Sequence, residues 1–249
     1  NGDGTFQAPP PFPPGTQGWL VAVGDLNGDG RLDIATQVSV LLGNGDGTFE
    51  ARQRFAVGDA PYSIGLGDLD GDGRLDIATA NVGSRDVSVL LGNSDESFQA
   101  QRQFASGFAV GGRPSDIALG DFNGDGRLDI VTANSHSDDV SVLLGNGNGT
   151  FPPPKRFTLG FTVGDGPTAI GLDDLNGDSR LDIVTANLHS DDVSVLLGNG
   201  DGTFQGQQRF AVGYAPASVG IGDLNADGRL DIATANLSSD DVSVLLGNG

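Results

Sequence analysis

The nine residues Asp25-Leu26-Asn27-Gly28-Asp29-Gly30-Arg31-Leu32-Asp33 begin a pattern that recurs four more times in this chain of 249 residues. The later copies begin at Asp68, Asp121, Asp174 and Asp223, at spacings of 43, 53, 53 and 49 residues. A second marker, Leu-Leu-Gly-Asn, follows each copy and begins at Leu41, Leu90, Leu143, Leu196 and Leu245. Because the two markers keep the same order throughout, the sequence predicts five copies of one structural unit.

Each unit is predicted to form four short β-strands. In the second unit, segments 63–66, 75–79 and 87–91 have the alternation or the β-branched residues of strands, and a fourth strand is expected over 98–110. Asn-Gly-Asp-Gly-Thr turns begin at Asn44 and Asn199, and they favour hairpins because Gly and Asn accept positive φ. No segment has helical periodicity.

Four-stranded units with this period predict an all-β fold, a five-bladed β-propeller with four antiparallel strands per blade. We expect one domain over residues 1–249, with units near 1–43, 44–92, 93–145, 146–198 and 199–247. The segment Asn1-Gly2-Asp3-Gly4-Thr5-Phe6 is in phase with the end of the chain, Leu245–Gly249. The N-terminal strand is therefore predicted to join the last blade and close the ring, which would leave no unpaired edge. Small residues on the first strand of each unit, such as Gly65 and Gly67, would permit close approach between blades.

The composition excludes several classes of protein. The chain has 33 acidic and 13 basic residues and a formal net charge of −20, which opposes binding to nucleic acid. It has no Cys, so disulfides, thiolate nucleophiles and zinc–thiolate sites are excluded. No apolar run approaches the ~18 residues of a membrane-spanning helix. Repulsion between so many negative charges opposes a compact fold, so the folded protein needs a compensating positive charge.

The acidic loop offers the oxygen atoms that a hard cation prefers. Positions 1, 3, 5 and 9 carry Asp or Asn, position 7 can add its backbone carbonyl, and Gly at position 6 allows a sharp turn. Several anionic oxygens match Ca²⁺ better than a softer metal. Metal-free Asx turns are the alternative for any one loop, but five loops between the same two strands favour a metal. An EF-hand fits less well, because Thr36 and Thr79 occupy position 12, where an EF-hand has its bidentate Glu.

These segments resemble the FG-GAP or VCBS-type repeats of integrin α-subunit-like β-propellers, including calcium-loaded lectins of fungi and bacteria. The resemblance rests on Gly24–Thr36 (GDLNGDGRLDIAT), Val38–Phe49 (VSVLLGNGDGTF) and their copies, and it covers essentially the whole chain. It implies about five Ca²⁺ ions, one per blade, between the first and second strands. The implied side-chain ligands are Asp25, Asn27, Asp29, Asp33, Asp68, Asp70, Asp72, Asp76, Asp121, Asn123, Asp125, Asp129, Asp174, Asn176, Asp178, Asp182, Asp223, Asn225, Asp227 and Asp231. The implied backbone carbonyls are those of Arg31, Arg74, Arg127, Arg180 and Arg229.

The chain departs from that family's usual pattern in a few places. Integrin-like propellers usually have seven blades, whereas this chain has five repeats. Ser179 replaces the turn Gly of the fourth loop, which predicts a strained and weaker site. Ala226 replaces Gly at position 4 of the fifth loop, which we expect to be a milder change, and Asp173 adds a carboxylate beside the fourth loop.

The remaining connections are predicted to lie on the face opposite to the acidic loops, and they vary in length. The first unit has only Gln37 where other units have seven residues, and the third and fourth units carry extra residues around 107–110 and 160–163. Loops on a rigid scaffold are a usual place for binding. The candidate ligand-binding residues are Trp19 and Tyr62, at one repeat position, and His136 and His189, in equivalent His-Ser-Asp-Asp turns. Adjacent residues of one turn do not form a Ser-His-Asp triad, so no catalytic residues are expected.

We expect a non-enzymatic, calcium-stabilised binding or adhesion module from an extracellular or periplasmic protein, monomeric, with glycans or extracellular proteins as partners. A glycan-binding lectin that uses the opposite loop face is the alternative. Further alternatives are the non-catalytic propeller portion of a larger secreted enzyme, such as a polysaccharide lyase, and an engineered repeat scaffold. The sequence contains neither Met nor a signal peptide, which favours a mature fragment or an engineered ring.

Overall fold

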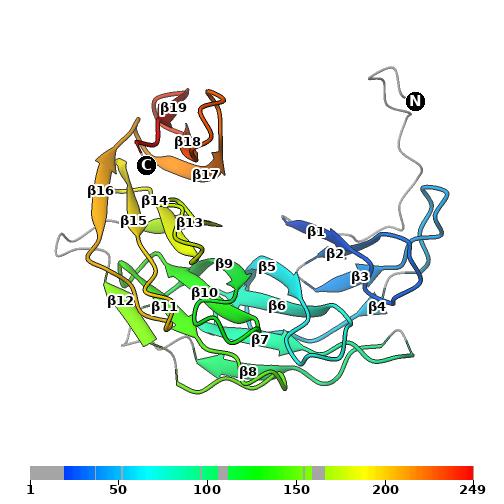
Figure 1. Ribbon diagram of the computed structural model, residues 1–249. Helices are drawn as coiled ribbons and strands as arrows, with labels where there is room; N and C mark the ends of the chain where they lie inside the picture. Colours follow the sequence, from blue (N-terminus) through cyan, green and yellow to red (C-terminus); the bar gives the residue numbers. More distant parts are fainter. Residues whose placement is uncertain are drawn as a thin grey trace.

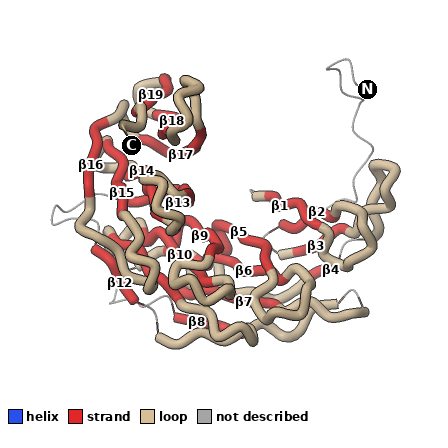
Figure 2. Tube along the Cα trace, in the orientation of Figure 1, coloured by secondary structure: helices blue, strands red, loops and turns tan. Residues whose placement is uncertain are grey.

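The protein is described by a computed structural model over residues 20–36, 38–51, 53–95, 97–105, 112–153, 155–158 and 166–248. All nineteen regular elements in these ranges are β-strands, as the sequence predicts (Figure 2). Over the same ranges, no helix has the length and apolar character needed to cross a membrane.

The strands form five antiparallel sheets, in which each strand pairs with the next one along the chain. The first sheet contains β1 (Val21–Gly24), β2 (Asp33–Thr36), β3 (Ser39–Leu41) and β4 (Gln53–Arg54). The second contains β5 (Pro61–Gly67), β6 (Asp76–Asn81), β7 (Asp86–Leu90) and β8 (Arg102–Ala105). The third contains β9 (Pro114–Gly120), β10 (Asp129–Asn134), β11 (Asp139–Leu143) and β12 (Lys155–Thr158). The fourth contains β13 (Pro167–Asp173), β14 (Asp182–Asn187), β15 (Asp192–Leu196) and β16 (Gln208–Ala211), and the fifth β17 (Pro216–Gly222), β18 (Asp231–Asn236) and β19 (Asp241–Leu245).

Each sheet is one blade of a β-propeller, and each corresponds to one of the five repeats (Figure 1). The fourth strand of the second blade begins later than expected, and residues 106–110 of its predicted span lie outside the described residues. Phe98 makes only an isolated bridge with Gly92, and β8 begins at Arg102. The cause is the turn before β8, which holds Phe98 against the end of β7 before the regular ladder resumes.

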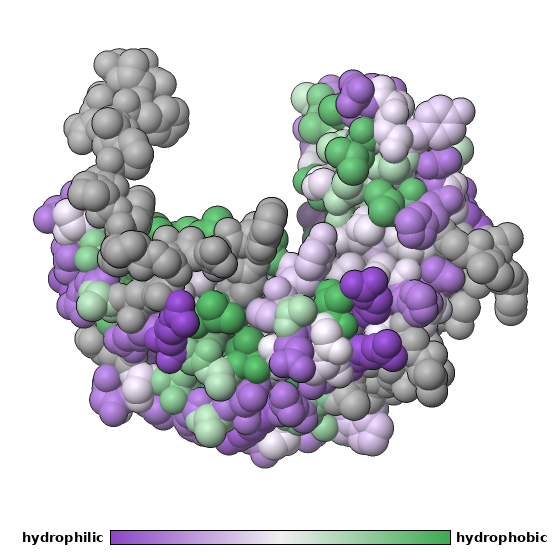
Figure 3. Space-filling model, turned by 180° about the vertical axis from the view of Figure 1, so that it is seen from behind, coloured by the Kyte–Doolittle hydropathy of each residue, from purple (hydrophilic) through white to green (hydrophobic). Residues whose placement is uncertain are grey.

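The blades follow one another in an arc, with the first strands β1, β5, β9, β13 and β17 in contact from blade to blade. In Figure 1 the first and last sheets lie at the two ends of this arc, and Figure 3 shows the opening between them from behind. Within the described residues, no hydrogen bond joins these two sheets. The strand predicted to close the ring, residues 1–6, lies outside the described residues, so that closure by this strand stays a prediction.

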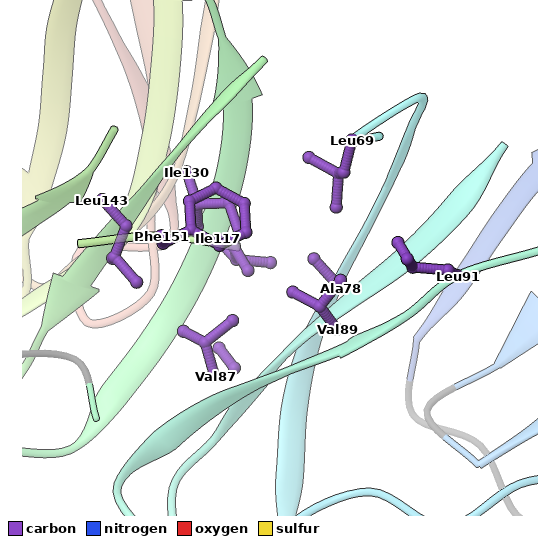
Figure 4. Packing of buried hydrophobic residues seen from close by; sticks show 10 residues of the cluster. Leu69, Ala78, Val87, Val89, Leu91, Ile117, Ile130, Leu143 and Phe151 are labelled. Atoms are coloured by element: carbon purple, nitrogen blue, oxygen red, sulfur yellow. The ribbon is translucent and has the colours of Figure 1, made fainter. Parts of the chain in front are cut away.

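The hydrophobic core lies between neighbouring blades. In Figure 4, Leu69, Val87 and Val89 of the second blade face Ile117 and Phe151 of the third. The inner strands of a blade are covered on both faces, and every residue of β6, β10 and β14 is buried for this reason. In β6, Ile77 packs toward the first blade, whereas Ala78 and Ala80 pack toward the third, as the alternation of side chains along a strand requires.

Glycines on the first strands form grooves that receive leucines of the next blade, as the sequence predicts. A Cβ atom at Gly67 would lie 2.6 Å from Leu128 Cδ1, and one at Gly120 would lie 2.6 Å from Leu181 Cδ1. In the last blade, no described atom lies within 4 Å of the equivalent position at Gly222. In the first blade, Leu32, which corresponds to Leu128 and Leu181, is 66% exposed. The arc therefore presents an apolar side chain at one end and a matching groove at the other.

Substitution of these glycines by leucine should distinguish a groove that the next blade fills from one that is open. Gly120→Leu should destabilise the protein by roughly 1–3 kcal/mol, because the new side chain overlaps Leu181. Gly222→Leu should change the free energy of unfolding by less than about 0.5 kcal/mol, since no described atom lies within 4 Å of it. Urea unfolding at a fixed Ca²⁺ concentration measures both. An equal loss in the two variants would contradict the open groove and show that the first blade occupies it in solution.

Candidate metal loops and loop-face pocket

The five acidic loops join the first and second strands of the blades, and all five are described in full. The first Asp of each loop accepts hydrogen bonds from the backbone that winds around it. Asp25 accepts from Gly28 N (2.8 Å) and Gly30 N (2.8 Å), and Asp68 accepts from Gly71 N (2.7 Å) and Gly73 N (2.8 Å). Asp121, Asp174 and Asp223 bind the backbone of their loops in the same way. The loop is thereby shaped around the carboxylate.

The last Asp of each loop is buried and connects two parts of the blade. Asp76 is 0% exposed, and its Oδ2 accepts from Leu69 N (2.8 Å) while its Oδ1 accepts from Gly92 N (2.8 Å). Asp33, Asp129, Asp182 and Asp231 make the same pair of bonds in their blades. The residue predicted as a metal ligand thus also joins the acidic loop to the end of the third strand, a role that the sequence analysis missed. The loop motif carries no signal for this role, because the partner Gly lies 10 residues beyond the Asp in the first unit and 16 residues beyond it in the other four.

In the second loop, positions 1, 3 and 9 converge on one point. Asp68, Asp70 and Asp76 each place a carboxylate oxygen within 4.8 Å of the others. Position 3 of the other four loops is Asn27, Asn123, Asn176 or Asn225, which offers an amide oxygen in place of a carboxylate. A cluster of oxygens of this kind fits a hard cation such as Ca²⁺.

Position 5 makes an ion pair in four of the five loops, and its predicted role as a metal ligand stays a prediction. Asp29, Asp72 and Asp178 pair with the arginine two residues later in their own loops, Arg31, Arg74 and Arg180. Asp125 lies 3.6 Å from Arg127. The position 5 carboxylates are thus paired with arginine, whereas in the second loop positions 1, 3 and 9 place their oxygens together.

In the fourth and fifth loops another residue replaces one of the two glycines, and the backbone is strained at that residue. Ser179 has φ 65° and Ala226 has φ 61°, close to the values of 75–82° at Gly28 and Gly30. Left-handed backbone costs a residue with a Cβ atom on the order of 1 kcal/mol. The strain predicted at Ser179 is therefore present, but the substitution at Ala226 is not milder for the backbone, because it adopts the same conformation.

The buried carboxylates carry a negative charge that the loops compensate poorly. Burial raises the pKa of the Asp76 carboxyl to about 6, and two neighbouring carboxylates, Asp70 and Asp72, add to the rise. Burial also raises the pKa of Asp70, Asp129 and Asp182. A group with a raised pKa gains from a proton or from a nearby cation.

The turns between the second and third strands lie at the other end of the blades and are held by a repeated polar network. Asn134 Nδ2 donates to Asp139 Oδ1 (2.6 Å) and to Ser141 Oγ (2.9 Å). Asn81, Asn187 and Asn236 make the equivalent bonds in their blades. These residues fix the turns that carry the candidate histidines. Their recurrence as Thr-Ala-Asn and Asp-Val-Ser is a signal that the sequence analysis did not use.

Three of the four candidate ligand residues meet in one pocket on this face. Tyr62 at the start of β5, His136 after β10 and His189 after β14 line a cavity of about 270 Å³ that spans three blades. The other lining residues are Val82, Arg113, Ser115, Ser135, Thr168 and Leu188. The fourth candidate, Trp19, and the short connection at Gln37 lie outside the described residues. We name this cavity the loop-face pocket.

Comparison with known families finds the FG-GAP-like repeat in five segments, residues 1–36, 35–79, 68–132, 121–185 and 174–234. A search of curated proteins finds no match.

Several solved structures have a similar fold. An Agrocybe aegerita lectin, described as specific for non-reducing terminal N-acetylglucosamine, is 23% identical with a TM-score of 0.56, over 92% of this chain and 66% of the lectin chain. A putative 6-phosphogluconolactonase from Bacteroides uniformis is 16% identical with a TM-score of 0.64, over 89% of this chain and 64% of its own. The Photorhabdus luminescens Tc holotoxin is 19% identical with a TM-score of 0.50, over 92% of this chain and 11% of its own. This chain therefore spans less than two thirds of the length of each of them.

The raised pKa of Asp76 predicts an unusual pH dependence for the metal-free protein. The folded pKa of about 6 lies above the ordinary value of 3.8, so this group stabilises the fold below pH ~4 and loses that contribution as the pH rises through about 6. In a chelator, urea unfolding should give a lower stability at pH 7.5 than at pH 4.5, and Asp76→Asn should reduce the difference. With saturating Ca²⁺ the trend should reverse, because the cation replaces the proton. A chelated protein that gains stability steadily from pH 4.5 to 7.5 would contradict the raised pKa.

Proposed function

The chain belongs to the FG-GAP-like repeat family, and from this premise we propose that it is a non-enzymatic binding module whose blades are stabilised by Ca²⁺. The observation that carries the proposal is the convergence of Asp68, Asp70 and Asp76 on one point in a loop that the chain repeats five times. Each loop then binds one ion through positions 1, 3 and 9, with position 5 and the backbone carbonyl of position 7 as further ligands.

The charge balance supports a cation in each loop. Sixteen of the 33 acidic residues lie in the five loops, and five Ca²⁺ ions would change the formal net charge from −20 to −10. The ion neutralises the buried last Asp of each loop, which also connects the loop to the third strand. Calcium binding therefore stabilises the strand connections, because the ion and the hydrogen bonds share the same carboxylate.

A binding role without catalysis accords with the loop-face pocket. Among the described residues that line it there is no Asp or Glu of the kind that orients a catalytic imidazole. We place the protein in an extracellular or periplasmic setting, where millimolar Ca²⁺ suits modules of modest affinity.

Removal of calcium should lower the melting temperature by about 10 °C or more. Each site adds ~2.7 kcal/mol when the free ion is at 100 times its Kd, and 1 kcal/mol shifts the midpoint by about 2–4 °C for a chain of this size. Calorimetry with EGTA, and then with Ca²⁺ restored, measures this change. Asp68→Ala should remove one bound ion in calorimetric titration, whereas Asp59→Ala, which removes an exposed carboxylate outside the loops, should leave the number unchanged. An unchanged melting temperature in EGTA would contradict the proposal.

Glycan binding in the loop-face pocket is a second candidate function. Tyr62 is 60% exposed and offers an aromatic face on which the apolar face of a sugar ring can pack, beside the donors of two histidines. The likeness of the fold to a lectin that recognises N-acetylglucosamine adds to this candidate.

The two exposed tyrosines offer a matched test of that candidate. On a glycan array, Tyr62→Ala should reduce binding by about tenfold or more, because it removes the stacking surface. Tyr214→Ala should leave binding unchanged, since Tyr214 lies on the same face outside the pocket. An array without any bound glycan at high protein concentration, or an equal loss in both variants, would contradict the assignment of the pocket.

A further inference from the structure

The loop-face pocket has a charge opposite to that of the chain, and from this we propose that its ligand is an acidic glycan, a sugar with a carboxylate. The inference rests on glycan binding as proposed above and specifies the class of sugar. Among the residues that the structure describes, no acidic side chain lines the pocket, whereas Arg113, His136 and His189 do. The pocket is thus a cationic, donor-rich site on an acidic protein.

Arg113 is the group that would bind the carboxylate. The arginines of the first four acidic loops, such as Arg31 and Arg74, pair with an Asp of their own loop. No carboxylate in the described part of the chain pairs with the Arg113 guanidinium. A guanidinium offers two parallel N–H donors that match the two oxygens of a carboxylate. Its charge is therefore available to a ligand.

Backbone bonds hold Arg113 beside the histidine turn. The Arg113 carbonyl accepts from Ser135 N (2.9 Å) and from Ser135 Oγ (3.2 Å), and Ser135 directly precedes His136. Below them, the buried Ser115 hydroxyl donates to Pro167 O (2.6 Å) of the next blade. These bonds join the backbone at Arg113 to the turn that carries His136, and they connect the third blade to the fourth at the pocket.

Three described carboxylates of the blades that form the pocket accept hydrogen bonds from donors of the protein. Asp138 Oδ1 accepts from Gly166 N (2.9 Å), and Asp191 Oδ1 accepts from Ala215 N (2.8 Å). Asp116 accepts from Ser63 Oγ (2.6 Å), Ile117 N (2.9 Å) and Ile170 N (2.8 Å). Each of these groups therefore serves to join backbone segments and does not occupy Arg113.

The net charge of the chain does not prevent an anion from binding at this point. Repulsion between separated charges is screened beyond ~8 Å at physiological ionic strength, whereas a contact with Arg113 is short-range. Loading of the acidic loops with Ca²⁺ at the other end of the blades lowers the repulsion further. Tyr62 offers an aromatic face on which a sugar ring can pack. An Asp or Glu side chain of a peptide has no such ring, so this contact favours an acidic sugar.

The test compares two sugars that differ only in the carboxylate. Surfaces coated with methyl-linked β-D-glucuronide or β-D-glucoside conjugates are exposed to the Ca²⁺-loaded protein at 150 mM NaCl, with a poly-glutamate surface as a third probe. We expect the glucuronide to be retained at least about tenfold more strongly than the glucoside. Arg113→Gln should reduce that ratio to about one, while Arg54→Gln, which changes an exposed arginine on β4, should leave it unchanged. The calcium-dependent melting temperature of both variants reports whether they are folded.

The outcomes separate this inference from the proposed function. Equal retention of the two sugars, with loss of both in Tyr62→Ala, would overturn the acidic class and leave glycan binding intact. Equal retention on poly-glutamate would also overturn it, because the pocket would then bind carboxylates without a sugar. No retention on any surface would overturn both this inference and the glycan-binding candidate, whereas the calcium proposal depends on the chelation melt alone.

Discussion

A buried carboxylate at the end of each acidic loop is the constraint on which the rest of the structure depends. Asp76 binds Leu69 N and Gly92 N at 2.8 Å each, so that one side chain fixes both the loop after the first strand and the end of the third strand. Leu69, whose N–H is bound by Asp76, also contacts the next blade, because its carbonyl accepts from Gly149 N (3.1 Å). The same carboxylate thus shapes its own blade and the contact to its neighbour. Its burial raises its pKa, and a cation in the loop relieves the resulting cost.

The two ends of the blades have different tasks. At one end, the acidic loops stabilise the strand connections and the contacts between blades. At the other end, short turns held by Asn, Asp and Ser carry side chains that gather in a pocket over three blades. Because Tyr62, His136 and His189 come from different blades, the shape of the pocket depends on blade packing. The proposed calcium and ligand sites would therefore be connected through the stacking of the sheets, although they lie at opposite ends of the blades.

The sequence predicts the parts of this architecture that depend on local pattern. The repeats give the five sheets, the acidic loops lie between first and second strands, and glycines such as Gly67 and Gly120 form the expected grooves. The double role of Asp76 could not be predicted in the same way, because its partner Gly92 is 16 residues away and bonds through the backbone. Arg113 was missed because it lies in a connection that varies between repeats. The pairing of position 5 with arginine also depends on side-chain geometry that the motif does not specify.

The central claim is that the acidic loops hold Ca²⁺ around their converging oxygens. The most direct measurement is anomalous X-ray diffraction from crystals grown in millimolar Ca²⁺. We predict one anomalous peak in each loop, with the oxygens of positions 1, 3 and 9 at about 2.3–2.6 Å from it, and the weakest peak at Ser179. Folded crystals without a peak in any of the five loops would contradict the account.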